Sequence, residues 1–224
     1  MLNTFMFIIF PYICLAAMLI GIAGNILFAG LRISAPATGF FEKKKLFWGI
    51  VPWHYGIITV LTGHLIGLLF PEAVLHASSV KGVRTAFEVA ALAGGFAAVF
   101  GGAVLLMRKL MENTLVSTAG GADYLAVALL CVQAVLGVSV ALNHRWGISW
   151  YAADMAEYLR GIITLRPSAA YVTGIPAVLS AHIVCGFLIF AVLPYTRLMH
   201  LLYVPVTYLF RKPQIIKAYS KTGN

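Results

Sequence analysis

Long apolar segments alternate with short polar ones along this chain. Five of them span about 20 residues or more, the length that an α-helix needs to cross the ~30 Å hydrocarbon core of a bilayer. They cover approximately residues 7–31, 47–70, 86–107, 122–142 and 176–204. The pattern predicts an all-α integral membrane protein, a bundle of five transmembrane helices. No Lys or Arg precedes Arg32, so the first segment is interpreted as a retained span and not as a signal peptide.

The composition supports this assignment. Apolar residues make up 61% of the 224 and charged residues 10%, with a mean hydropathy of +0.92, whereas a soluble domain carries about 25% charged residues. Because no loop is long enough to fold alone, residues 1–224 are predicted to form a single domain. The longest loop, about 143–175, is expected to lie along the outer membrane interface, with a short amphipathic helix around Ala152–Thr164.

Basic residues predict the orientation, because cytoplasmic loops accumulate Lys and Arg. Eleven fall on one side of the membrane: Arg32, Lys43, Lys44, Lys45, Arg108, Lys109, Arg197, Arg211, Lys212, Lys217 and Lys221. Five fall on the other: Lys81, Arg84, Arg145, Arg160 and Arg166. We therefore expect a multi-pass protein of the cell inner membrane, with its N-terminus outside and its C-terminus in the cytoplasm. The net charge of +9 then reflects topology and contact with anionic lipid, and does not indicate nucleic-acid binding.

Four histidines lie inside two of the predicted spans, where an ionisable side chain is by default a candidate for function. His54 and His64 are ten residues apart, and His182 and His200 are eighteen apart. At about 1.5 Å per residue these separations are roughly 15 and 27 Å along a helix. The spans run in opposite directions, so depth pairs His54 with His200 near the inner face and His64 with His182 near the outer face.

Paired imidazoles at two depths could hold two haem groups, since a six-coordinate haem b needs one imidazole on each side of the iron. A single such histidine would more often bond a backbone carbonyl, but four in complementary pairs favour haem. The unequal separations require tilting or a kink, for which Pro194 is a candidate. Glycines that would let a porphyrin lie close to the second and third spans are Gly56, Gly63, Gly67, Gly94, Gly95, Gly101 and Gly102. His76 and His144 fall in outer loops and are expected to be solvated.

Three sequence runs resemble the gamma subunit of membrane-bound respiratory nitrate reductase. They are RLMHLLYVPVTYLFRKPQ from Arg197 to Gln214, TAGGADYLAVALLCVQAVLGV from Thr118, and PWHYGIITVLTGHLIGLL from Pro52. The resemblance implies a five-helix dihaem cytochrome b, with axial ligands at His54, His64, His182 and His200. It also implies that quinol is oxidised at the outer haem and that electrons pass inward to an iron–sulfur beta subunit and a molybdenum-containing alpha subunit.

The expected quinol site lies beside the outer haem, between the ends of the second and third spans. Gly63, His64 and Glu88 are expected to line it, together with Lys81 or Arg84, which compete for the role of the family's quinol-side lysine. Glu88 is the best available proton acceptor, although pairing with Arg84 at i, i+4 is the simpler interpretation.

At the inner end, Arg197 lies about one helical turn from His200 and is the expected partner of a haem propionate. Its competing role is anchoring the chain at the membrane surface.

Other functions remain open at this point. Cytochrome b subunits of sulfite or heterodisulfide reductase, hydrogenase or formate dehydrogenase complexes could also carry paired histidines, and a small transporter could use them as a proton relay. The C-terminal run favours nitrate reductase over the first group. A measurement of haem content would distinguish a cytochrome b from a transporter, which is expected to contain no haem.

Overall fold

The computed structural model describes residues 2–28, 43–111 and 121–196. Within these ranges the chain forms helices and turns without β-strands, as predicted. The N-terminal span is nearly continuous: α1 (Leu2–Thr4), a π-helical turn η1 (Phe5–Ile9) and α2 (Phe10–Leu27). The remaining long helices are α3 (Lys43–Leu69), α5 (Lys81–Met111), α7 (Gly121–Asn143) and α10 (Ala177–Val192).

These helices give four candidate membrane spans in the described part of the chain, at Leu2–Leu27, Lys81–Arg108, Tyr124–Asn143 and Ala177–Tyr195. A fifth comes from α3 together with α4 (Pro71–Ser79), a pair bent by 105°. The bend follows from Pro71, which has no N–H to continue the ladder of α3 and is favoured at the start of a new helix. The sequence had indicated only a loop here, and it placed the start of α5 at residue 86 instead of Lys81.

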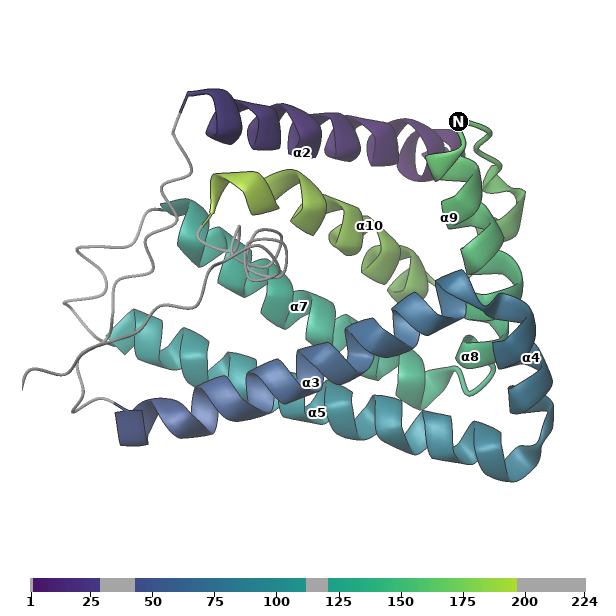
Figure 1. Ribbon diagram of the computed structural model, residues 1–224, viewed down its shortest axis with the longest axis horizontal. Coiled ribbons are helices and arrows are strands. Elements are labelled where there is room, and N and C mark those ends of the chain that lie inside the picture. The colour runs from purple at the N-terminus through teal and green to yellow at the C-terminus, as the bar shows by residue number, and fades with distance from the viewer. Residues whose placement is uncertain (1, 29–42, 112–120, 197–224) are drawn as a thin grey trace, which may run out of the picture.

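The long helices pack in the order α3, α5, α7, α10, α2, each chiefly against the next. In Figure 1 the short helices α4, α8 and α9 gather at the end of the bundle where the N-terminus lies. α10 ends at Val192 and continues into the 3₁₀ turn η5 (Leu193–Tyr195), so Pro194 does interrupt the α-helix.

Small residues bring α3 and α5 into backbone contact. A Cβ atom added to Gly56 would lie 2.5 Å from the backbone oxygen of Gly94, and one added to Gly101 would lie 2.4 Å from the backbone nitrogen of Trp53. Such close approach is typical of membrane helix pairs, which lack a hydrophobic driving force and depend on van der Waals contact. The expectation that Gly56, Gly94 and Gly101 make room for a porphyrin was therefore wrong, because another helix fills that space.

The long loop between α7 and α10 contains a cap segment, residues 147–163, made of α8 (Gly147–Trp150), the π-helical turn η3 (Tyr151–Met155) and α9 (Ala156–Ile163). A helix was predicted here, but this one packs more deeply than an interfacial helix would. Tyr158 is fully buried and its hydroxyl donates to the backbone carbonyl of Phe7 at 2.7 Å. A short 3₁₀ turn, η4 (Ala169–Val172), then leads to α10.

Candidate functional site

Two of the four predicted histidines face each other. The ring centroids of His64 on α3 and His182 on α10 are 6.4 Å apart, with 39° between the ring planes. Two metal–imidazole bonds of about 2.0 Å, with about 1.1 Å from each nitrogen to its ring centre, place the centroids of a bis-imidazole site roughly 6.3 Å apart. The spacing of this pair therefore suits one metal ion held between the two rings.

Both histidines of α3 have the same local hydrogen bond. The Nδ1–H of His64 donates to the carbonyl of Val60 and that of His54 to the carbonyl of Ile50, each at 2.8 Å. Because a carbonyl can only accept, each Nδ1 carries the hydrogen and each Nε2 keeps a free lone pair. This is the tautomer that a histidine needs in order to ligate a metal through Nε2.

Tyr151 of the cap segment covers the His64 level of α3. Its hydroxyl donates to the backbone carbonyl of His64 at 3.0 Å, and its ring meets the imidazole edge-on, with centroids 5.0 Å apart. A Cβ on Gly67 would lie 2.8 Å from the same ring, so a glycine is required there. Burial raises the pKa of Tyr151 to about 12, so its hydroxyl stays protonated to a higher pH than an exposed tyrosine. Sequence analysis missed this role, which depends on a contact 87 residues apart.

His182 is more buried than His64 and lies against α7. A Cβ on Gly137 would be 3.0 Å from its Cε1, and the side-chain nitrogen of Gln133 lies 3.4 Å from its Nε2. Its buried Nδ1 has no hydrogen-bond partner among the described residues. By contrast, no described atom lies within 4 Å of the position that a Cβ on Gly63 would take, so α3 is open beside His64.

A charged cluster forms at the same end of the bundle. Glu88, with 15% of its side chain exposed, pairs with Arg145 at 3.0 Å and more loosely with Arg84 at 3.8 Å. The Arg84 pair was expected from its i, i+4 spacing, whereas Arg145 is 57 residues away and becomes a neighbour only through the fold. Lys81 is the first residue of α5 and is exposed.

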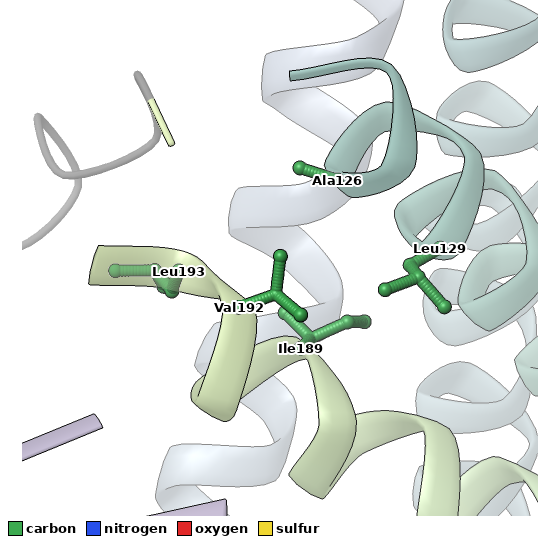
Figure 2. A pocket seen from close by; sticks show the side chains of 5 residues that line it. All are labelled: Ala126, Leu129, Ile189, Val192 and Leu193. Atoms are coloured by element: carbon green, nitrogen blue, oxygen red, sulfur yellow. The ribbon is translucent and has the colours of Figure 1, made fainter. Parts of the chain in front are cut away.

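The two histidines that were predicted in loops make other contacts. His76 is in the last turn of α4, and the centroid of the His144 ring lies 5.3 Å from that of Trp146, with 46° between the ring planes. His200 and Arg197 lie outside the described residues, so of the predicted inner pair only His54 is described. One apolar pocket between α7 and α10, drawn in Figure 2, is lined by Ala126, Leu129, Ile189, Val192 and Leu193. These five side chains carry no group for chemistry.

Comparison with known proteins connects this geometry to a family. The family described as nitrate reductase gamma subunit matches residues 3–219. The chain belongs to this family. It is 30% identical over 224 residues to the respiratory nitrate reductase 1 gamma chain of Escherichia coli (strain K12), covering 97% of this chain and 98% of that one.

Two further relatives show how the gamma subunit fold is used. The nitrate reductase gamma chain of Bacillus subtilis (strain 168) is 32% identical over 182 residues, which is 80% of this chain and 81% of the relative. The nitrate reductase-like protein NarX of Mycobacterium tuberculosis (strain ATCC 25618 / H37Rv) is 23% identical over 223 residues, 96% of this chain but 34% of that protein. A gamma-like segment can thus be part of a longer polypeptide.

Membership in the gamma subunit family makes this chain one subunit of an oxidoreductase complex whose catalysis lies on another subunit. Its long apolar helices make it the membrane component. The likeness spans nearly the whole chain, including the parts that carry His54, His64 and His182.

Proposed function

We propose that this chain is the quinol-oxidising, dihaem cytochrome b subunit of a respiratory nitrate reductase, and the anchor that holds the complex on the inner membrane. The observation that carries the proposal is the facing pair, His64 and His182, at the spacing of a bis-imidazole metal site. The free Nε2 of His64 and the glycine beneath His182 add to the fit. When bound, the two haems b would supply one-electron transfer between quinol and an iron–sulfur partner.

In this proposal the chain's own residues hold the haems, orient the ligating imidazoles and shield them from water. His64 and His182 hold the outer haem, and His54 and His200 hold the inner one. Val60 and Ile50 orient the α3 imidazoles through their carbonyls, while Tyr151 excludes water from one side of His64. Arg197 is the proposed propionate partner. The cytoplasmic end would dock the beta subunit, which connects to the molybdenum-containing alpha subunit.

The proposed quinol site lies beside the outer haem, at Gly63 and His64, with Glu88 and either Lys81 or Arg84. The open space at Gly63 supports it, as does the antiparallel packing of α3 on α5. Gly56 meets Gly94 and Ala98 across this interface, so Glu88 lies at about the level of His64 on the neighbouring helix. Glu88 pairs with Arg145 at 3.0 Å and is the proposed acceptor for a proton that quinol releases.

A reduced-minus-oxidised optical spectrum of the purified chain tests the haem assignment. We expect two non-covalent haems in the wild type, loss of the outer haem in His64→Ala or His182→Ala, and loss of the inner one in His54→Ala or His200→Ala. His76→Ala is the matched control and should retain both. Two haems in all four ligand variants would refute the assignment, and a haem-free wild type would favour a histidine proton relay instead.

The quinol site is tested separately in the assembled complex. The double variant Lys81→Gln, Arg84→Gln should slow reduction of the haems by quinol and weaken binding of a quinol analogue, with both haem spectra intact. Arg166→Gln, another basic residue of the outer side, is the control. Unchanged quinol kinetics in the double variant would move the site away from this end of the bundle.

A further inference from the structure

Two successive turns of α3 are bonded to the cap segment beside His64. The Tyr151 hydroxyl donates to the carbonyl of His64 at 3.0 Å, and the Arg160 guanidinium donates to the carbonyl of Leu68 at 3.1 Å. The second bond supplies a donor that the helix lacks, because α3 ends at Leu69 and the last carbonyls of a helix have no partner within it. The cap segment is thus fixed on α3 at the level of His64.

The ring of Tyr151 is confined between two groups of α3. It is nearly perpendicular to the His64 imidazole, at 84° with the centroids 5.0 Å apart, an arrangement that aromatic pairs favour. The same ring lies on Gly67, where a Cβ atom would be 2.8 Å from its Cδ1 and Cε1. Because the hydroxyl is also bonded, the Tyr151 ring has little freedom to move, and its contact with the imidazole is fixed.

A histidine ring depends on such contacts to keep one orientation. The torsion that turns the imidazole about its Cβ–Cγ bond has a broad energy well, so packing and hydrogen bonds determine the plane of the ring. In His64 the Nδ1–H bond to the carbonyl of Val60, at 2.8 Å, fixes one edge of the ring. The Tyr151 ring supplies a second contact, from the cap segment, that restrains the remaining rotation.

We propose that Tyr151 is a positioning residue for the outer haem, because it sets the plane of the His64 imidazole relative to that of His182. The inference rests on the proposed ligation of this haem by both histidines. The two ring planes are 39° apart. In a ferric haem with two imidazole ligands, the angle between the ligand planes changes the spacing of the iron d orbitals, and with it the low-field electron paramagnetic resonance (EPR) signal. That signal therefore reports the orientation that Tyr151 is proposed to maintain.

EPR spectra of the purified, oxidised complex test the proposal. The outer signal is identified as the one that His64→Ala removes. Tyr151→Leu removes the ring and the hydroxyl, and should shift or broaden the outer signal while leaving the inner signal unchanged. Gly67→Ala leaves Tyr151 in place but displaces its ring from the side of α3, and should alter the same signal.

Tyr158→Phe is the matched control. It also removes a tyrosine hydroxyl from the cap segment, but that hydroxyl bonds the carbonyl of Phe7 in the N-terminal span at 2.7 Å. A general loosening of the cap segment would therefore appear in this variant too, whereas loss of the contact with His64 would not. We expect both EPR signals of Tyr158→Phe to match those of the wild type.

An altered outer signal in Tyr151→Leu, with the inner signal and the Tyr158→Phe spectrum unchanged, would establish the positioning role. An unchanged outer signal in Tyr151→Leu, or the same alteration in Tyr158→Phe, would overturn it. If Tyr151→Leu lost the outer haem, the signal of Gly67→Ala would decide in the same way. A wild type without haem would instead refute the proposed function, so the two failures are distinguishable.

Discussion

Leu165 adopts a backbone conformation that leucine rarely takes. Its φ is 60°, at the point where α9 ends. The N–H of Arg166 bonds the carbonyl of Gly161 at 2.8 Å and that of Leu165 bonds Ile162 at 3.3 Å, the paired bonds of a helix C-terminus that usually has glycine in this position. Leu165 is 76% exposed as a residue, so it gains little from packing.

Leu165→Gly should therefore stabilise the protein. Relief of the left-handed strain, about 1–2 kcal/mol for an L-residue, outweighs the extra freedom that glycine gives the unfolded chain, about 0.4–1 kcal/mol. We expect a net gain of about 0.5–1 kcal/mol, measured by unfolding in detergent. Leu165→Val, which worsens the strain, should destabilise. A lower stability for the glycine variant would contradict this account.

The pKa values of two tyrosines in the cap segment predict that the folded protein loses stability at high pH. Burial raises the pKa of Tyr151 to about 12 and that of Tyr158 further still, whereas an unfolded tyrosine titrates near 10. Above pH ~10 the unfolded chain loses protons that the folded chain keeps, so stability falls as the pH rises from about 10 to 12. Unfolding midpoints measured across this range should decline, and less steeply in Tyr158→Phe. A flat profile would contradict the prediction.

At the scale of elements, glycine positions determine which helices meet. Gly56 and Gly101 let α3 touch α5, Gly95 faces Val138 of α7, and Gly67 receives the ring of Tyr151. Each contact uses the absence of a side chain to bring backbone or ring within van der Waals distance. Gly24 on α2 differs, since no described atom lies within 4 Å of its Cβ position.

Gly101→Leu should disrupt the bundle. Its first side-chain carbon would collide with the backbone of Trp53, which cannot move aside as a flexible side chain could. Overpacking typically costs about 1–3 kcal/mol, and a backbone clash belongs at the upper end. Thermal unfolding in detergent measures the loss. Gly24→Ala is the control and should leave the midpoint unchanged or raise it, because alanine favours the helix. Equal midpoints for the two variants would argue against tight α3–α5 packing.

The elements differ in how far the sequence predicts them. Helix length follows from apolar runs, which is why the first four long helices were predicted to within about five residues, whereas α10 ends at Val192, before Pro194, and the predicted end of the last span at residue 204 lies outside the described residues. The sequence did not predict which helix packs against each helix face. These helices are apolar on all sides, so hydrophobic periodicity cannot distinguish a lipid-facing side from one that contacts protein. Gly56 and Gly101 were therefore predicted to contact a porphyrin, whereas they contact a neighbouring helix. The approach of His64 to His182 was inferred from depth, whereas Tyr151, Gln133 and Arg145 reach the site only through tertiary contacts.

At the scale of the whole molecule, the predicted orientation remains to be tested. The charged cluster at Glu88, which includes Arg145, and the cap segment belong to the part of the chain that the basic-residue count assigns to the outside. With a quinol site there, protons would be released outside while electrons move inward, against a potential worth about 2.3 kcal/mol per charge per 100 mV. The arrangement would conserve energy as a membrane potential.

Reporter fusions check that orientation. A fluorescent protein that matures in the cytoplasm should light up when fused after Asn224 and stay dark when inserted in the outer loop at Gly174. A periplasmic phosphatase at the same two sites should give the reverse. Fluorescence at Gly174 would invert the topology and with it the direction of electron flow.

The hydrogen bonds inside α3 have a consequence for how this chain is made. His54, Thr59 and His64 each bond the carbonyl four residues earlier, at 2.8 Å. These three side chains thus bond their own helix backbone without help from any neighbour, which lowers the penalty for leaving the translocon into lipid. α3 can therefore partition into the bilayer during synthesis, before α5, α7 or α10 has left the ribosome.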